Sequence, residues 1–323
     1  MTTSAELMQA PWWRRLGLQN YVVYVGFVLV FLYFAITQTQ YFLTGTNLAN
    51  IVIQAAPVTV MAVGMVFVLS AGEIDLSIGS VVALSALVTA VTLRSTDQWL
   101  LAAAAGLVVG ALVGLLNGLF VTMVRLPSFL VTLATMGLVA GLARQLTDLQ
   151  SVPVTNATFV SLFGGGSVLG IPILIWWTAV AIAVGWMFLR QRRYGAHVLA
   201  VGNNSSAARV SGIKVNRVRL MVLVGSAMTA ALAGLLYAGR LQGARYTLGE
   251  ADLMTVIAAA IVGGTSLFGG KGSVVGALIG SLLMSMLNNG LVLAGLTVSQ
   301  QMIARAIIIL IAVSFSLRGK KSQ

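Results

Sequence analysis

Two carboxylate residues, Glu73 and Asp75, interrupt a long apolar stretch of the sequence. They belong to the segment GEIDLSIGS, residues 72–80, together with Ser77. A carboxylate at membrane depth costs about 2.5 to 3.5 kcal/mol, so such a group is by default a candidate for function. Two interpretations are open. Either Asp75 caps the next helix through its N-terminal amides while Glu73 is solvated, or Asp75 and Ser77 line a path for a substrate or a proton.

A glycine-rich segment, GGTSLFGGKG at residues 263–272, is the second candidate. It looks like a phosphate-binding loop. However, the pattern GxxxxGK[ST] needs glycine where this chain has Thr265, and serine or threonine where it has Gly272. We therefore predict a tight turn that breaks a membrane helix. Across both segments, the predicted helix-breaking positions are Gly72, Gly79, Gly264, Gly269, Gly270 and Gly272.

Amide side chains lie inside otherwise apolar stretches, as Asn288, Asn289 and Gln54. Buried amides in lipid need partners, so they either bridge helices or line a polar path. Both readings remain open. Amides both donate and accept hydrogen bonds without carrying charge, which suits a neutral polyhydroxylated solute.

The segment GNNSSAARVSGI, residues 202–213, contains the signals of a very short helix. Asn204 or Ser205 is a natural N-cap, residues 207–211 supply one or two turns, and Gly212 ends them. A helix this short is not stable alone, so we expect it to dock into a groove on a partner. The alternative is an ordinary surface loop. The candidate contact residues are Asn204, Ser205, Ala208, Arg209, Ser211 and Gly212.

The composition of the chain indicates which kind of structure holds these candidate residues in place. Of the 323 residues, 59% are hydrophobic, 8% are charged and none is cysteine. This excludes a soluble enzyme, a disordered chain and a disulfide-linked secreted protein. The single histidine, His197, cannot build a metal centre. No nucleophile–base pair can be assembled, so we expect no enzymatic activity and no cofactor. The fold class is an all-α polytopic membrane protein.

Apolar runs of about twenty residues predict ten transmembrane helices. They form a single transmembrane domain over residues 21–317, between tails at 1–20 and 318–323. The short helices lie beside the breaks near 72–80 and 263–272. The predicted spans are 21–37, 51–71, 76–93, 99–124, 128–147, 171–189, 218–239, 252–268, 272–294 and 298–317.

Basic residues orient these spans, because lysine and arginine accumulate in cytoplasmic loops. With both termini cytoplasmic, only Arg94, Arg144, Arg240 and Arg245 are outside and Arg305 lies within the last span. The other basic residues are then cytoplasmic: Arg14, Arg15, Arg125, Arg190, Arg192, Arg193, Arg209, Lys214, Arg217, Arg219, Lys271, Arg318, Lys320 and Lys321.

The only long cytoplasmic segment is residues 190–217. No segment outside the membrane is large enough for a nucleotide-binding domain. Energy for any transport must therefore come from another chain or from an ion gradient.

Two patterns concern helix packing. Glycine recurs at every fourth position in Gly106, Gly110, Gly114 and Gly118, and again in Gly276 and Gly280, which predicts close helix–helix contact. The sequence GSVVA at 79–83 also resembles GSVVG at 272–276, which indicates a possible parallel internal repeat. A rival alignment of residues 109–114 with 275–280 reverses the direction through the membrane.

The segments GEIDLSIGS, GNNSSAARVSGIKV, GGTSLFGGKGSVVGALIG and LNNGL occur in this order along the chain. In this combination the chain resembles the membrane permease subunit of bacterial ABC importers for monosaccharides, of the ribose, xylose, arabinose and galactose type. The resemblance covers essentially the whole length. One departure is Glu73, where relatives often carry glycine.

The resemblance implies a multi-pass protein of the bacterial inner membrane that forms a homodimer. Its implied partners are a periplasmic or lipoprotein sugar-binding protein and a cytoplasmic ATPase with two cassettes, which binds the ATP and magnesium. The segment from Asn204 to Gly212 would be the coupling helix that contacts the ATPase. No nucleic acid is expected.

Two alternatives stay open. One is a permease of the same superfamily for branched-chain amino acids or nucleosides. The other is a proton- or sodium-coupled secondary transporter, for which Glu73, Asp75 and Arg305 are the titratable candidates.

Overall fold

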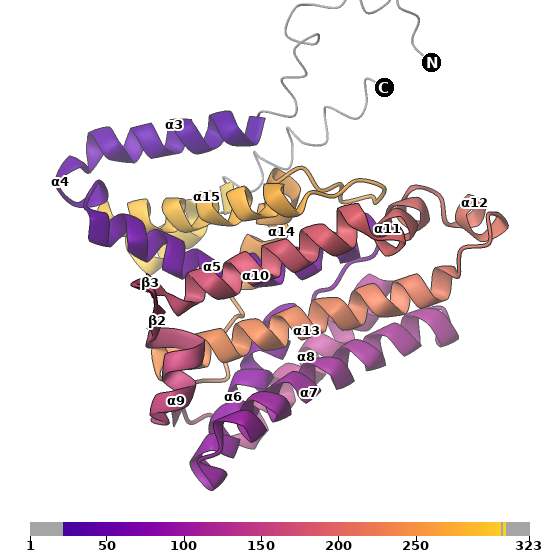
Figure 1. Cartoon of the computed structure of the whole chain (residues 1–323), viewed down its shortest axis with the longest axis horizontal. Coiled ribbons are helices and arrows are strands. Elements are labelled where there is room, and N and C mark those ends of the chain that lie inside the picture. The colour runs from indigo at the N-terminus through magenta and orange to yellow at the C-terminus, as the bar shows by residue number, and fades with distance from the viewer. Residues whose placement is uncertain (1–21, 305, 308–323) are drawn as a thin grey trace, which may run out of the picture.

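The computed structural model describes residues 22–304, 306 and 307. Most of these residues lie in helices, and the long helices run in roughly one direction or its reverse (Figure 1). The predicted tails and most of the last predicted span, 298–317, lie outside the described residues. The helices of the first half are α3 (Val22–Thr37), α4 (Thr39–Phe42), α5 (Gly45–Ser70), α6 (Ile78–Thr96), α7 (Trp99–Leu119), the π-helical η2 (Phe120–Val124) and α8 (Ser128–Leu146).

The second half continues with α9 (Ala157–Val160), η3 (Ser161–Gly165), α10 (Ile173–Trp186), η4 (Met187–Gln191), α11 (Arg193–Asn203), α12 (Ser205–Val210), α13 (Val215–Leu241), α14 (Asp252–Val262) and α15 (Val274–Leu293). The four strands described have two residues each: β1 (Val152–Pro153) pairs antiparallel with β4 (Gly243–Ala244), and β2 (Ser167–Val168) with β3 (Ile171–Pro172). They are too short to change the helical fold class.

In the described part of the chain, seven helices are long and apolar enough to cross a membrane. They are Gly45–Ser70, Ile78–Thr96, Trp99–Val124, Ser128–Leu146, Ile173–Gln191, Val215–Leu241 and Val274–Leu293. Two shorter apolar helices, Tyr24–Thr37 and Asp252–Val262, match two further predicted spans. The second stops at Val262, before the predicted boundary of 268, because the glycine turn begins there. An all-α polytopic membrane protein is thus confirmed.

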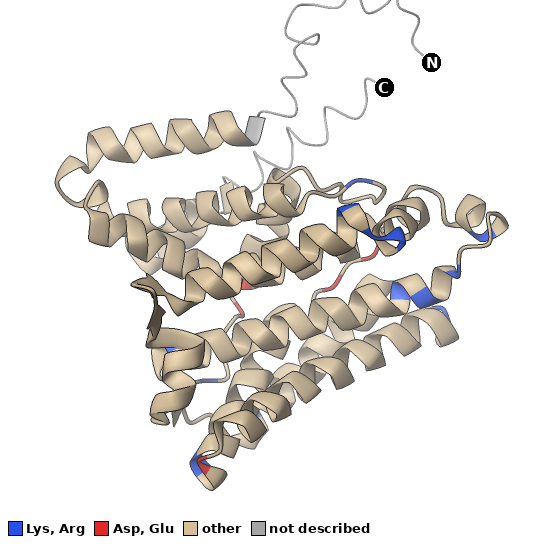
Figure 2. Cartoon of the chain, in the orientation of Figure 1, with Lys and Arg blue, Asp and Glu red and all other residues tan. Residues whose placement is uncertain are grey.

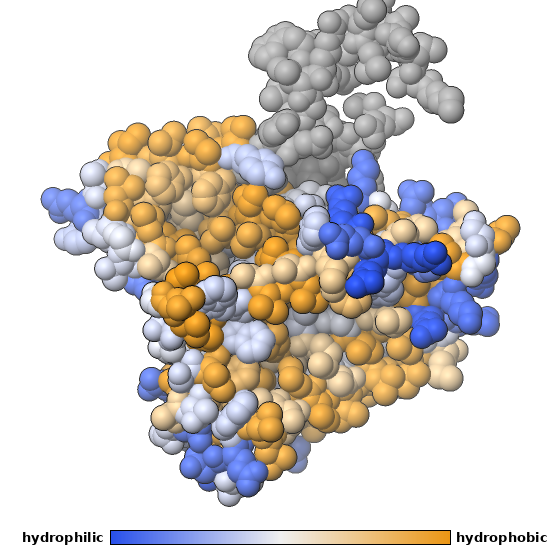
Figure 3. Space-filling model, in the orientation of Figure 1, coloured by the Kyte–Doolittle hydropathy of each residue, from blue (hydrophilic) through white to orange (hydrophobic). Residues whose placement is uncertain are grey.

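The core lies where α5 and α6 pack against α13, and most side chains of α5 are buried. By contrast, α8 and α10 expose most of their apolar side chains. Figure 3 shows apolar residues covering the visible face of the bundle between hydrophilic ends. This distribution is the one that a bilayer requires, because the hydrocarbon solvates the exposed apolar side chains.

Small residues allow the closest helix contacts. A methyl group on Gly110 would lie 2.6 Å from the Ala227 carbonyl oxygen, and one on Gly114 would lie 2.6 Å from the Val224 Cα. Both neighbours belong to α13, so the glycines of α7 form its packing face against α13, as predicted. On α15, Gly276 and Gly280 likewise approach the backbone of Gly263 and α14.

Basic residues concentrate at one end of the bundle, around α11, α12 and the start of α13 (Figure 2). The chain positions at this end are Arg125, Arg190, Arg192, Arg193, Arg209, Lys214, Arg217, Arg219 and Lys271, and those at the opposite helix ends are Arg94, Arg144, Arg240 and Arg245. We call these the basic end and the opposite end. Both helix breaks, 71–77 and 263–273, lie toward the basic end, where α5 and α14 finish.

Candidate functional site

The short helix α12 stands out from the basic end of the bundle (Figure 1). Asn204 is its N-cap: the backbone is extended there, and the side-chain oxygen accepts hydrogen bonds from the N–H groups of Ser206 and Ala207, both at 3.0 Å. Gly212 follows the helix with φ +84°, a left-handed conformation that favours glycine. The predicted N-cap and stop are confirmed, and the helix begins at Ser205 rather than Ala207.

Some side chains in and directly after α12 are buried or hydrogen-bonded within the chain, and others are exposed. Ala208 is buried toward the start of α13, and the Ser211 hydroxyl donates to the Ala207 carbonyl. Arg209 is exposed, and Val210 is 91% exposed. An aliphatic side chain this exposed, on a capped turn, suits a surface that a partner covers. Sequence reasoning had not singled out Val210.

The end of α11, directly before α12, packs against both helix breaks. A methyl group on Gly202, at the end of α11, would overlap the Ser70 carbonyl oxygen and lie 2.8 Å from the Gly270 nitrogen. The Gly270 N–H donates to the Ser70 carbonyl at 3.0 Å, which joins the two breaks directly. We call this contact of Ser70, Gly202, Gly269 and Gly270 the glycine junction. Through Gly202, α11 therefore contacts both the end of α5, directly before the 71–77 break, and the 263–273 break.

The other predicted helix-breaking glycines have different roles. Gly72, Gly264, Gly269 and Gly270 all have positive φ, so they carry the turns themselves. Gly79 lets the start of α6 pack against the Gly249 carbonyl, and Gly272 lies against the Ser70 side chain. The residues of 263–273 therefore form the predicted turn between α14 and α15.

Asp75 is fully buried in the 71–77 break. Its Oδ1 accepts from the Ser77 backbone N–H at 2.9 Å and from the Ser77 hydroxyl at 2.6 Å. Its Oδ2 accepts from the Ser226 hydroxyl of α13 at 2.8 Å, and Asn117 of α7 donates to the Ser77 hydroxyl at 3.0 Å. We call these four residues the Asp75 clasp. Ser77 is the N-cap residue of α6, so Asp75 bonds to the residue that precedes the helix and not to the amides of its first turn.

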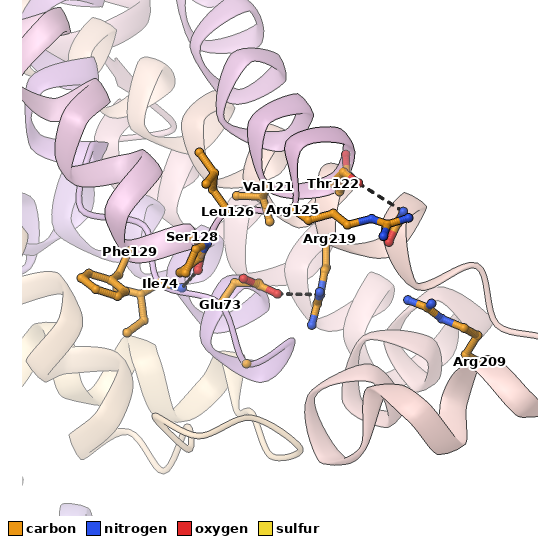
Figure 4. A pocket seen from close by; sticks show the side chains of 13 residues that line it. Glu73, Ile74, Val121, Thr122, Arg125, Leu126, Ser128, Phe129, Arg209 and Arg219 are labelled. Carbon is orange, nitrogen blue, oxygen red and sulfur yellow. Dashed lines mark hydrogen bonds and ion pairs between the residues drawn. The ribbon is translucent and has the colours of Figure 1, made fainter.

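Glu73 is not solvated, which corrects one expectation from the sequence. It is 6% exposed, and its Oε1 lies 2.7 Å from the Nε of Arg219 on α13 (Figure 4). Burial raises the pKa of Glu73, while the Arg219 charge and the Ser128 hydroxyl lower it. Because the residue lies only two positions from Asp75, the pair connects the same break to α13 a second time.

Of the three predicted amides, Asn289 has the helix-bridging role. Asn289 of α15 and Asn47 of α5 exchange hydrogen bonds at 2.8 and 3.1 Å, so Asn289 bridges helices. The Asn288 Oδ1 atom is buried and has no hydrogen-bond partner among the described residues. Gln54 is half-buried on α5, two turns after Asn47 and so on the same side of the helix. Asn47 is a partner that sequence reasoning had missed.

These features define a multi-pass helical membrane protein with a short exposed helix at its basic end and buried polar breaks behind it. Residues 47–313 match the family described as "Branched-chain amino acid transport system / permease component". The chain belongs to this permease family.

Curated relatives span nearly the same length. The chain is 38% identical over 289 residues to the ribose import permease protein RbsC of Escherichia coli K12, covering 88% of this chain and 90% of the relative. It is 35% identical to the L-arabinose ABC transporter permease protein AraH of Azospirillum brasilense, covering 97% and 93%. It is 34% identical to the D-allose transport system permease protein AlsC of Escherichia coli K12, covering 85% and 84%. No solved structure was found to match the chain.

Proposed function

We propose that this chain is the membrane-spanning permease subunit of an ATP-driven importer for a monosaccharide. The observation that carries the proposal is α12: a capped helix of six residues with an exposed tip, in a chain similar along most of its length to ribose, arabinose and allose permeases. A separate cytoplasmic ATPase with two cassettes supplies the energy and holds the ATP and magnesium.

The basic end is the cytoplasmic side in this proposal, because basic loops favour the cytoplasm. Both termini then lie in the cytoplasm of a bacterial cell, and the chain crosses the inner membrane ten times. A second copy completes the importer, and a periplasmic or lipoprotein sugar-binding protein delivers the sugar to the opposite end. The α5–α6 and α14–α15 pairs, each with a glycine break, are the corresponding parts of a parallel internal repeat.

Coupling runs from α12 to the glycine junction. ATP binding closes the cassettes and displaces α12 together with α11. Since Gly202 lies against Ser70 and Gly270, this displacement moves the 71–77 and 263–273 breaks together. Movement of both breaks alternately opens the path to either side, and hydrolysis resets it. The contacts with the ATPase are made by Asn204, Ser205, Ala208, Arg209, Ser211 and Gly212.

A neutral sugar needs hydrogen-bonding groups along its path rather than charges. Gln54 and Asn288 are the path residues in this proposal, and Asn289, bonded to Asn47, holds the helices beside them. The unpartnered Asn288 oxygen has capacity for a hydroxyl donor. The 71–77 break is the gate of the path in this proposal. Asp75 and Ser77 hold it closed through the hydrogen bonds of the clasp.

The family description favours one alternative, a substrate of the branched-chain amino acid type. A zwitterion would need a carboxylate and a cation free to pair with it. Asp75 already accepts three hydrogen bonds and Glu73 already pairs with Arg219. Titration of the cognate soluble receptor with pentoses, hexoses and leucine separates the two substrate classes.

A reconstituted importer tests the proposal. In liposomes containing the chain, its ATPase and its binding protein, sugar uptake should require ATP. It should stop when Arg209 and Gly212 are both altered. Sugar uptake by the chain alone, driven by a proton or sodium gradient, would overturn the proposal in favour of a secondary transporter.

A further inference from the structure

A pocket of about 550 Å³ opens at the basic end, between the 72–74 segment, the η2–α8 connection and the start of α13 (Figure 4). It lies apart from the amide candidates and from the Asp75 clasp, because none of those residues lines it. Of the residues that line the pocket, the proposed contacts with the ATPase use only Arg209, and the cavity itself has no role in them.

Three arginines line the pocket, with one carboxylate to balance them. Arg219 pairs with Glu73. The side chains of Arg125 and Arg209 make no ion pair or hydrogen bond with any residue that the structure describes. Figure 4 shows all three guanidinium groups extending into the same space. Like charges gathered this way repel, and an anion between them would relieve that repulsion.

The backbone brings Arg125 to this position at some cost. Arg125 follows the π-helical η2 and has φ +63°, a left-handed conformation that is unfavourable for a residue with a Cβ. π-Helical turns occur frequently at functional sites. The first turn of α8, at Ser128 and Phe129, lines the same pocket and adds the favourable end of a helix dipole.

One side of the pocket continues into an apolar surface. Met123, Val124, Leu126 and Phe129 are 74%, 57%, 42% and 46% exposed at the end of one predicted span and the start of the next. The ends of membrane spans lie where the hydrocarbon core meets the headgroup region, so a lipid here presents both its headgroup and its acyl chains. A ligand that fits both the arginine-lined pocket and the apolar surface beside it has a phosphate group, which pairs with the arginines, and hydrocarbon chains, which pack on the apolar side chains.

We propose that this pocket binds the phosphate of an anionic phospholipid of the cytoplasmic leaflet. Its phosphate lies between Arg125 and Arg209, and its acyl chains lie along Met123, Val124 and Phe129. This lipid site is additional to the transport path and rests only on the proposed orientation of the chain in the membrane, so it can fail while the transport proposal stands.

The test measures lipid retention by the full chain purified in phosphatidylcholine nanodiscs doped with phosphatidylglycerol. The native chain should retain phosphatidylglycerol over phosphatidylcholine. Arg125→Gln combined with Arg209→Gln should weaken that retention by about 30-fold, since two charges near the headgroup are lost. A double lysine variant at the same positions should keep most of the binding because it keeps the charge.

The matched control is Arg94→Gln with Arg245→Gln, which removes two exposed arginines at the opposite end and should leave retention unchanged. Equal retention of both lipids by the native chain would overturn the proposal. So would displacement of phosphatidylglycerol by inorganic phosphate alone, which would indicate a site for a free anion. Binding of poly-glutamate in place of the lipid would assign the pocket to an acidic protein partner.

Discussion

Hydroxyl groups and a backbone N–H, rather than a cation among the described residues, stabilise the buried carboxyl group of Asp75 in the 71–77 break. Its two oxygens reach α6 through Ser77 and α13 through Ser226, while Asn117 adds α7 by way of the Ser77 hydroxyl. A buried carboxylate without hydrogen bonds would be strongly unfavourable. The clasp therefore fixes the start of α6 relative to two other helices, and in the proposed mechanism it breaks when the gate opens.

Ser226→Ala should destabilise the protein by about 1.5 to 3 kcal/mol, because it leaves one oxygen of the buried carboxylate without a donor. The measurement is the free energy of unfolding in a detergent titration. Ser95→Ala is the control, because Ser95 is exposed and its hydroxyl bonds to carbonyls of its own helix. Equal stability of the two variants would mean that the clasp contributes nothing.

At the residue scale, the sequence identified Asp75 and Ser77 but not their partners. Ser226 lies 151 positions from Asp75, and no spacing rule relates serines at that separation. The same holds for Arg219 and Glu73, and for Asn47 and Asn289, which lie 242 positions apart. A solvated Glu73 was one of the open interpretations, because the burial of this side chain depends on how α13 packs beside the break and cannot be read from the sequence.

Among the helices, α12 depends most clearly on its own capping residue. Asn204 satisfies two backbone N–H groups of a helix that has only six residues. Replacing Asn204 with alanine should make formation of α12 less favourable by about 1 kcal/mol, because the N-cap hydrogen bonds are lost. If the ATPase binds only the folded helix, its affinity should fall about fivefold. Biolayer interferometry with the purified ATPase measures this affinity.

Asn204→Ser supplies another good cap and should restore the affinity. If the alanine and serine variants bind the ATPase equally, the cap has no part in docking.

The glycine junction gives a second prediction at this scale. Gly202→Ala places a methyl group on the Ser70 carbonyl, so α11 must shift away from the breaks. Overpacking of this kind should lower ATP-driven uptake by about tenfold while binding of the ATPase to α12 persists. Gly225→Ala is the matched control, because a methyl group there meets no atom within 4 Å. Equal uptake by both variants would contradict coupling through the junction.

Element boundaries were predictable where the determinants are local. The N-cap and glycine stop of α12 are read from neighbouring residues, and so is the turn at 263–273. The division of the 190–217 segment into α11 and α12, with an extended Asn204 between them, was only partly visible, because α11 is stabilised by packing against other elements.

For the whole molecule, the distribution of basic residues predicts the membrane orientation. The native chain contains no cysteine, so single cysteines can be introduced without background. Val210→Cys should react with a membrane-impermeant maleimide only from the cytoplasmic side, and Leu169→Cys only from the outside, since these residues are 91% and 88% exposed at opposite ends. Labelling of intact cells before and after permeabilisation makes the measurement. Reaction of Val210→Cys in intact cells would reverse the orientation.

The class of fold was predictable at this scale because continuous apolar runs and low charge leave few alternatives. Seven long apolar helices lie at predicted spans, together with two shorter ones. The arrangement of those helices was not predictable, apart from the small-residue face of α7, because lipid-facing and protein-facing apolar residues look alike in a sequence.

Photo-crosslinking from α12 tests most directly whether a separate ATPase drives this chain through that helix. A benzophenone maleimide on Val210→Cys in the assembled importer should crosslink to the ATPase, and mass spectrometry of the product identifies the partner. The account predicts a crosslink to the nucleotide-hydrolysing subunit that is lost when that subunit is left out. A crosslink to the sugar-binding protein, or none at all in an importer that takes up sugar with ATP, would contradict it.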